Sequence, residues 1–328
     1  MNRRSTISAL GITIAILCLA AAAPPSRAIA QPQQLDDSTF VPTVAAPAFT
    51  KRHPTVLFDE AHHDFHTLEG RYRAFAALLR ADGFTLTPNK EPFTAKSLAG
   101  HDLLVIANAM GDDPETGNDS TVALPAFTPE EVAAVHAWVE GGGSLLLIAD
   151  HSPFGSAAAA LGAAFGVDMS RGYACDSTQA FSGSMTNLEF TRERKTLGDH
   201  PIVNGRIPKE RLEKVVAFTG ESLRGPAGST PILLLSDDAF DLPPAALRLR
   251  ADPEAMMKEA VPAKGRSMAV ALAARRGRVV VQGEAGMLAA QVIVFPDGRE
   301  PVRFGMNRAG LDNQQYALNL ARWLARAE

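Results

Sequence analysis

The chain has 328 residues, of which 46% are hydrophobic and 21% are charged, and its formal net charge is −4 at pH 7. This length and apolar content suffice for a sizeable globular core. A mildly acidic chain has no electrostatic footprint for nucleic acid or for an anionic membrane surface, which excludes both as expected partners.

The first thirty residues predict a cleavable export signal. Arg3 and Arg4 give a positive start, an apolar run extends from Ile7 to Ala23, and Ala28-Ile29-Ala30 offers small residues to a signal peptidase. The competing interpretation is a transmembrane anchor, but the run is rich in alanine and two prolines follow it. We therefore expect a periplasmic or secreted protein, cleaved near Ala30 and with no stable membrane span afterwards. The choice between the general and the twin-arginine export route stays open.

Cleavage changes both the charge and the cysteine content. Removing residues 1–30 takes away Arg3, Arg4 and Arg27 and no acid, so the formal charge moves from −4 to −7. Cys18 is lost as well, and Cys175 remains as a single cysteine that cannot form an intramolecular disulfide. A lone cysteine is more often buried than catalytic.

The domain organisation follows from composition. Residues 31–52 are rich in Gln, Pro, Ala and Thr without periodicity, which predicts a flexible leader. From residue 53 to 328 we expect a single α/β domain.

The first part of this domain alternates strands and helices. Thr55–Phe58 is an apolar run that predicts a strand and ends in Asp59-Glu60. Apolar residues then recur at helical spacing from Leu68 to Leu79, and Leu103–Ala107 predicts a second strand. The polar span Gly111–Leu124 is expected to be a loop.

The clearest unit of the sequence begins at Thr128. Thr128 and Glu131 have the spacing of a capping box, and Pro129 stands at the first helical position, where its missing N–H costs nothing. Three glycines end this helix, and Ser144–Ala149 follows as a continuous apolar run typical of a parallel strand buried on both faces. That strand ends abruptly in Asp150-His151, before an alanine-rich helix.

The second half is less regular. Few elements are predicted between Asp168 and Lys214, and residues 237–266, rich in Pro, Ala and charge, predict an irregular surface excursion. Met268–Ala273 and Arg278–Gln282 flank an Arg-Arg-Gly turn, which predicts a hairpin.

Two short strands and a terminal helix complete the prediction. The strands cover Val215–Phe218 and Ile232–Leu235. Asp312 is expected to cap the helix, with Gln315 at its third position.

The alternation predicts an open, mainly parallel sheet with helices on both faces. Ligands in this architecture bind outside the carboxyl ends of the strands. The polar residues at those ends are the candidate site: Asp59 to His66, Asn108, Asp150, His151, Glu221 and Glu284.

Three histidines, His62, His63 and His66, lie within five residues beside Asp59. Imidazole and carboxylate groups together can bind Zn²⁺ or another divalent ion, or can move protons. The competing interpretation is a solvated loop, and the H-E-x-x-H zinc signature is absent. Asp59, His62 and His63 are therefore catalytic candidates, and no metal ligand is assigned.

Asp150, His151 and Glu284 are the other catalytic candidates, because each follows a predicted buried strand. Asp150 could instead cap the next helix, and Glu284 could begin one. Ser152 is a weak nucleophile candidate, since no G-x-S-x-G turn surrounds it.

The order of these motifs resembles a known superfamily. A strand followed by D-E-x-H at residues 59–62, the run W-V-E-G-G-G-S-L-L-L-I-A-D-H at 138–151 and D-N-x₅-N-x₃-W-L at 312–324 look like the class I glutamine amidotransferase-like group. Within it, the chain is most similar to ThuA-like proteins, GldG-type domains and exported relatives of unknown function. The resemblance covers about residues 55–165 and 277–324 and implies a flavodoxin-like sheet.

The sequence departs from that superfamily at the point where chemistry would occur. True amidotransferases carry a nucleophilic cysteine on the turn after the strand at 144–149, whereas this chain has Asp150-His151-Ser152. Glutaminase activity is therefore not expected.

Two function classes remain open. One is an exported hydrolase acting on a small polar or carbohydrate-like substrate, with acid–base groups or metal ligands among the candidate residues. The other is a non-catalytic module of the cell envelope that binds a ligand or a partner. The sequence establishes no cofactor, leaves a divalent metal open and does not give the oligomeric state.

Overall fold

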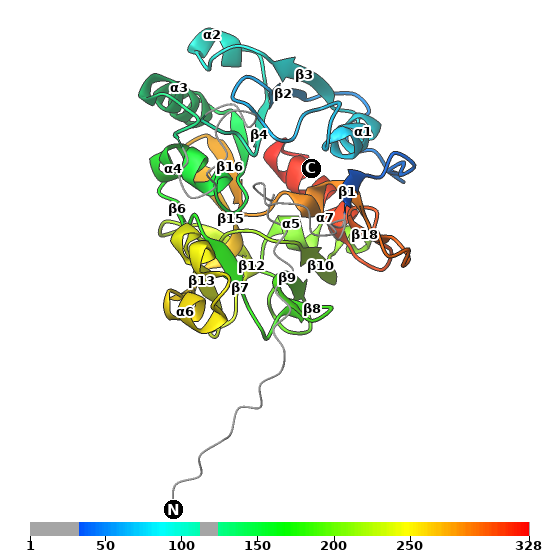
Figure 1. The fold of residues 1–328 in the computed structure, drawn as a ribbon. Helices are drawn as coiled ribbons and strands as arrows, with labels where there is room; N and C mark the ends of the chain where they lie inside the picture. The colour runs from blue at the N-terminus through cyan, green and yellow to red at the C-terminus, as the bar shows by residue number, and fades with distance from the viewer. Residues whose placement is uncertain (1–32, 112–123, 328) are drawn as a thin grey trace, which may run out of the picture.

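The computed structural model describes residues 33–111 and 124–327. The predicted export signal and most of the loop predicted for Gly111–Leu124 lie outside these ranges. A nine-stranded sheet crosses the molecule in the order β3-β2-β4-β5-β16-β15-β11-β6, with β12 also paired to β15 (Figure 1).

One half of this sheet is parallel. Its five strands are β3 (Thr85–Asn89), β2 (Thr55–Asp59), β4 (Leu103–Ala107), β5 (Ser144–Ile148) and β16 (Gly277–Gln282). Every residue of β4 and β5 is buried, as expected for strands covered on both faces. Numbered by their appearance in the chain, the five strands lie in the order 2-1-3-4-5.

The other half is antiparallel, so the sheet is mixed rather than mainly parallel. The predicted hairpin is confirmed, because β15 (Ser267–Ala274) pairs antiparallel with β16. Antiparallel pairing continues beyond β15, with β11 (Leu223–Arg224) and β12 (Thr230–Leu234) on β15 and β6 (Asp168–Met169) on β11. The prediction of a mainly parallel sheet was wrong for this half because the segment after α4, in which few elements were predicted, returns to the sheet as short strands that pair antiparallel.

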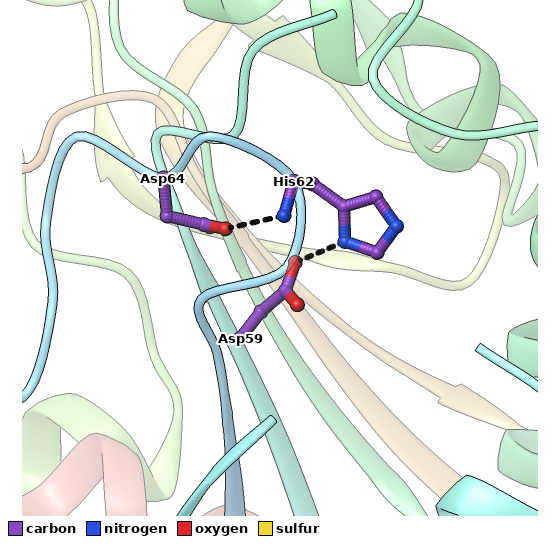
Figure 2. A group of neighbouring side chains, drawn as sticks. All are labelled: Asp59, His62 and Asp64. Carbon is purple, nitrogen blue, oxygen red and sulfur yellow. Dashed lines mark hydrogen bonds and ion pairs between the residues drawn. The ribbon is translucent and has the colours of Figure 1, made fainter. Parts of the chain in front are cut away.

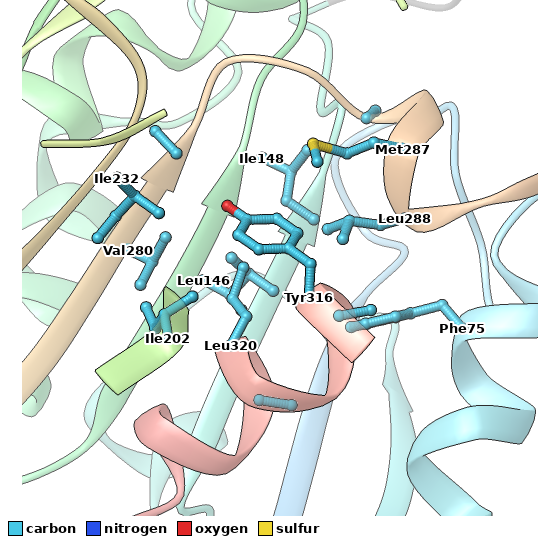
Figure 3. Packing of buried hydrophobic residues seen from close by; sticks show 14 of the residues in the cluster. Phe75, Leu146, Ile148, Ile202, Ile232, Val280, Met287, Leu288, Tyr316 and Leu320 are labelled. Carbon is cyan, nitrogen blue, oxygen red and sulfur yellow. The ribbon is translucent and has the colours of Figure 1, made fainter. Parts of the chain in front are cut away.

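Helices cover both faces of the sheet, as predicted. On one face, α1 (Arg73–Ala81) and α7 (Asn313–Leu324) share a core with the strands. Figure 3 shows Tyr316 and Leu320 of α7 directed toward Leu146 and Ile148 of β5. On the other face, a second core joins the strands to α2 (Ala95–Leu98), α3 (Pro129–Glu140) and α4 (Phe154–Ala164).

The two helix starts predicted from sequence have different outcomes. The capping box of α3 is confirmed: the Glu131 N–H donates to Thr128 Oγ1 at 3.2 Å, and the Thr128 N–H donates to Glu131 Oε2 at 3.0 Å. Asp312 precedes α7 but makes no capping bond. Its carboxylate instead accepts from the backbone N–H groups of Glu213 and Lys214, at 2.7 and 2.9 Å.

The segment predicted as a flexible leader packs on the domain from residue 33 onward. β1 (Gln33–Asp36) pairs antiparallel with β17 (Ala290–Val294), which in turn pairs with β18 (Val302–Gly305). Phe49 is buried and meets Phe84 edge to face, with ring centroids 4.7 Å apart. Composition alone missed this packing because the partners of the segment lie elsewhere in the chain.

The middle of the chain is more regular than predicted. β9 (Ser184–Thr191) pairs with β10 (Lys214–Ala217) and β8 (Ala180–Phe181) in a separate small sheet. The excursion predicted at 237–266 folds around a small apolar cluster that includes Tyr173, Leu242 and Met256. The elements of the excursion are β13 (Phe240–Leu242), η2 (Pro244–Leu249), α6 (Pro253–Lys258) and β14 (Val261–Pro262). The remaining elements of the described chain are β7 (Tyr173–Cys175), α5 (Pro201–Asn204), η1 (Pro208–Glu210) and η3 (Gly286–Leu288).

Among the described residues, no helix has the length and apolarity needed to cross a membrane.

Candidate functional site

Polar side chains form a row where the parallel strands end. Asp59 is the last residue of β2, and the neighbouring strands β4, β5 and β16 are followed by Asn108, Asp150 and Glu284. β2 and β16 are three strand spacings apart, about 14 Å. The candidate residues therefore lie along one end of the sheet but fall into two groups, which we call the His62 group and the Asp150 group.

The His62 group (Asp59, His62, Asp64, Asn89 and Glu131) is built around a buried imidazole ring. His62 Nδ1 lies 2.7 Å from Asp59 Oδ2, and Nε2 lies 2.8 Å from Glu131 Oε1. Figure 2 shows the first of these contacts and the backbone of His62 facing Asp64. Burial lowers the pKa of His62, but the hydrogen bonds and charges of the two carboxylates outweigh it, and the net pKa is raised.

Two members of the His62 group were not predicted as site residues. Asn89, at the end of β3, donates to Asp59 Oδ1 at 3.0 Å. Glu131 was predicted only as a capping residue, yet the same carboxylate also accepts from the Phe93 N–H at 3.0 Å. Beyond the capping box, no sequence signal marks Glu131 as a site residue, because its contact with His62 joins positions 69 residues apart.

Asp64 completes the His62 group. Its carboxyl lies against that of Asp59, and burial together with the Asp59 charge raises the pKa of Asp64 well above its usual range. Asp64 Oδ1 is buried and has no hydrogen-bond partner among the described residues.

The other two histidines of this loop lie apart from the group. His63 is exposed, with its backbone in the left-handed region at φ 51°. His66 is buried with its ring 4.5 Å from that of Tyr72, and burial lowers the pKa of His66 to about 3. The cluster of histidines in the sequence is thus not a cluster of imidazoles in space, because the loop directs the three rings to different surroundings.

The Asp150 group consists of Asn108, Asp150, His151, Glu221 and Glu284. Asp150 and His151 are its least buried members. Both are half-buried at the end of β5. Asp150 Oδ1 accepts from the His151 N–H at 2.8 Å, and Asn108 Oδ1 accepts from the Asp150 N–H at 2.9 Å. His151 stacks on Tyr173 with ring centroids 4.4 Å apart. Burial raises the pKa of Asp150. Asp150 does not cap α4, whose preceding residue makes no side-chain capping bond.

Glu284 lies behind this pair and is only 1% exposed. Its carboxyl accepts from the N–H groups of Gly286 and Met287, at 2.5 and 2.8 Å, at the start of η3. Burial and the charge of Asp150 raise the pKa of Glu284 well above its usual range. Glu284 thus bonds the first N–H groups of η3 from the position before its N-cap, Ala285, which makes no side-chain capping bond.

Glu221 is a second fully buried carboxyl near Asp150. Its Oε2 accepts from the Arg171 N–H at 2.6 Å, whereas Oε1 has no partner among the described residues. Gly155 of α4 makes room for this carboxyl, since a Cβ there would lie 2.4 Å from Oε1. Burial, followed by the charges of Asp241 and Asp150, raises the pKa of Glu221 well above its usual range.

The one cysteine of the described chain is not placed for catalysis. Cys175 lies in β7, and burial raises the pKa of its thiol to about 12. A surface pocket between α5 and α7 is lined by Arg206, Asn319 and Trp323, among others, and by none of the predicted site residues. The candidate site is therefore defined by its chemistry rather than by this hollow.

No protein-family model matches the chain, and no curated protein sequence matches it. Solved structures do resemble it. The N-terminal domain of mmIFT52 is 13% identical, with a TM-score of 0.54 over 82% of this chain and 97% of that domain.

Two further structural neighbours have lower TM-scores. A ThuA-like protein from Bacteroides uniformis ATCC 8492 is 13% identical, with a TM-score of 0.41 over 86% of this chain and 94% of that one. The cytoplasmic protein STM1381 from Salmonella typhimurium LT2 is 14% identical, with a TM-score of 0.43 over 84% and 99%. At these identities, the likeness is one of fold.

Proposed function

We propose that this protein is an exported hydrolase of a small polar or carbohydrate-like substrate, built on an amidotransferase-like fold without the catalytic cysteine. In support of that fold, the parallel half of the sheet has the strand order 2-1-3-4-5, which is the flavodoxin-like order. The export signal predicted from residues 1–30 supports a periplasmic or extracellular location.

One observation carries the hydrolase proposal: Asp150 and His151 adjoin each other, only partly buried, at the carboxyl end of a central buried strand. An acid–base pair there can reach a ligand that lies over the sheet end. Burial raises the pKa of Asp150 toward neutral pH. A catalytic acid or base transfers protons most effectively when its pKa lies near the operating pH.

The roles in the Asp150 group follow from accessibility. Asp150 and His151 would exchange protons with a water molecule and with the leaving group of the substrate. Glu284 would act as a positioning residue, because its carboxyl is buried and bonded to the backbone of η3. Asp59 and His62 belong to the separate His62 group, two strands away at the end of β2, and take no role in this proposal.

A specific observation favours the second candidate, a non-catalytic binding module. Both ring nitrogens of His62 and the Glu284 carboxyl are bonded within the protein. Such saturated groups stabilise a crevice without performing chemistry in it.

Turnover of chromogenic glycosides, esters and amides by the purified protein distinguishes the two candidates. We expect hydrolysis of at least one class, and a loss of kcat of about 10²-fold or more in Asp150→Asn, the scale of acid–base catalysis. The exposed Asp238→Asn is the matched control and should leave kcat unchanged. No turnover of any class, combined with thermal stabilisation by members of the same panel, would favour the binding module. Equal kcat in Asp150→Asn and the wild type would overturn the assignment of Asp150.

A further inference from the structure

The His62 group has the donor atoms of a metal site. One ligand atom from each of Asp59, His62 and Asp64 can be chosen so that all lie within 4.8 Å of one another. Asp59 is fixed by β2, while His62 and Asp64 come from the loop that follows it (Figure 2). An imidazole nitrogen with two carboxylate oxygens suits a borderline divalent cation.

The surroundings already orient these donors. Glu131 bonds His62 Nε2 at 2.8 Å, which leaves Nδ1 as the nitrogen that faces Asp59. A carboxylate on the distal nitrogen is the usual outer-shell partner of a metal-ligating histidine. Asn89 likewise holds Asp59 Oδ1 at 3.0 Å, so that Oδ2 is the oxygen directed inward.

The contact between the two aspartates supplies an independent reason for a cation. Asp59 is 0% exposed and lies against Asp64, whose Oδ1 is buried without a hydrogen-bond partner in the described chain. Two carboxylates in contact need a positive charge or a shared proton between them. The backbone N–H of His62 reaches only Asp64 Oδ2, at 3.3 Å, so Oδ1 remains available to a ligand.

We propose that Asp59, His62 and Asp64 bind a divalent first-row metal ion, with Zn²⁺ as the best match. Three protein ligands leave at least one coordination position for water or for a ligand, as in catalytic rather than structural zinc sites. His62 Nδ1 and Asp59 Oδ2, now 2.7 Å apart, would separate to about 3.3 Å around a tetrahedral zinc ion. Zinc is preferred over manganese because it binds nitrogen and oxygen donors more tightly.

The shell around the site would exclude competing solvent. The His62 ring lies between Phe93 and Phe127, with centroid distances of 4.7 and 4.9 Å. An apolar shell of this kind controls water access to a bound metal.

The test uses full-length, tag-free protein treated with a chelator and then titrated with ZnCl₂, MnCl₂ or MgCl₂. We expect about one Zn²⁺ per chain by elemental analysis, weaker binding of Mn²⁺ and a rise in Tm with zinc. Asp64→Asn should weaken zinc binding at least tenfold, and Glu131→Gln should weaken it by about 10- to 100-fold through the orientation of His62. His63→Gln, an exposed histidine on the same loop, is the matched control and should bind zinc like the wild type.

Equal zinc affinity in Asp64→Asn, Glu131→Gln and the wild type would overturn the proposal, as would the absence of stoichiometric zinc in the folded wild type. Co²⁺ gives a second readout that does not depend on variants: its visible spectrum should show low-symmetry coordination with nitrogen, and an aqueous spectrum would count against the site. None of these measurements needs turnover. The metal proposal can therefore hold or fail independently of the hydrolase proposal. Asp150→Asn should keep its zinc even if it loses activity.

Discussion

Both ends of the polar row bury carboxyl groups, but their hydrogen-bond partners differ. At the end of β2, a histidine lies between two carboxylates, so that negative groups face a ring able to carry positive charge. At the ends of β5 and β16, carboxyls gather without such a ring between them and rely on backbone N–H donors. Burial then raises their pKa values. At the first, the compensated end, an imidazole faces two carboxylates, although the pKa of Asp64 there is raised too; at the second, the proton-retaining end, burial favours the protonated form of the carboxyls.

The two ends also differ in how their side chains are held. The compensated end links β2, β3 and α3 through buried side-chain hydrogen bonds of Asp59, His62 and Asn89. The proton-retaining end holds the half-exposed pair Asp150 and His151. Variants at each end should therefore fail differently.

The largest effect is expected from Glu131→Ala at the compensated end. It leaves His62 Nε2 and the N–H groups of Phe93 and Thr128 without their acceptor. Breaking a buried ion pair from one side costs about 3–5 kcal/mol of unfolding free energy. Urea denaturation should show this loss, while the exposed neighbour Glu130→Ala should change stability by less than about 0.5 kcal/mol. A cost below about 1 kcal/mol for Glu131→Ala would mean that the imidazole is not held as described.

Glu221→Gln should change how the unfolding free energy depends on pH, which tests whether the carboxyls near Asp150 are protonated. The pKa of Glu221 is raised in the folded protein by burial and by the charges of Asp241 and Asp150, against a lowering by the Arg171 backbone hydrogen bond and by Arg266. Above about pH 4.3 the unfolded carboxyl ionises while the folded one keeps its proton, so wild-type stability falls as pH rises.

The glutamine variant lacks this loss, because its amide can still accept from the Arg171 N–H and does not titrate. Its stability relative to the wild type should therefore grow with pH, by up to about 1.4 kcal/mol per unit, until the folded carboxyl ionises. Denaturation curves between pH 5 and 8 measure this, with the exposed Glu259→Gln as control. Parallel pH profiles for Glu221→Gln and the wild type would show that Glu221 is ionised in the fold.

Gly155→Ala tests the packing of the same carboxyl. The new Cβ would lie 2.4–2.6 Å from the carboxyl atoms of Glu221, which must then move. Overpacking of this kind costs about 1–3 kcal/mol. The cost should shrink in a Glu221→Ala background, and an unchanged cost in the double variant would place the strain elsewhere.

The smallest effect is expected from Tyr72→Phe, beneath the Asp150 group. Its hydroxyl donates to the Ala285 carbonyl at 2.8 Å, next to Glu284. Losing one such bond while the ring stays packed should cost about 1 kcal/mol. Thermal unfolding measures it, and a change several times larger would indicate that Tyr72 also orders the loop that carries Glu284.

The sequence was sufficient wherever a local pattern decided the structure. The capping box at Thr128 and Glu131, the buried run of β5 and the turn between β15 and β16 depend on neighbours within a few residues. The position of the polar residues at the strand ends followed from those elements, which is why Asp59, Asp150 and Glu284 lie in one row.

What the sequence could not supply were contacts between distant segments. Asn89 and Glu131 meet Asp59 and His62 from 30 and 69 residues away, and no spacing rule connects them. The same holds for Glu221 and Gly155. The Glu221 carboxyl packs against α4 only because Gly155 has no Cβ. The three histidines showed the converse error, since closeness in the chain did not bring their rings together.

The pairing of β1 with β17 has a consequence for how the chain reaches its native state. Gln34 contacts Gln291, 257 residues later. The first strand of the domain therefore has no partner until almost the whole chain has been synthesised. Until β17 has been synthesised, the backbone N–H and C=O groups of β1 can bond only to water. The pairing of β1 with β17 therefore forms late in synthesis. Loop-closure entropy makes such late, long-range pairing slow, so β1 is expected to dock among the last elements of the fold.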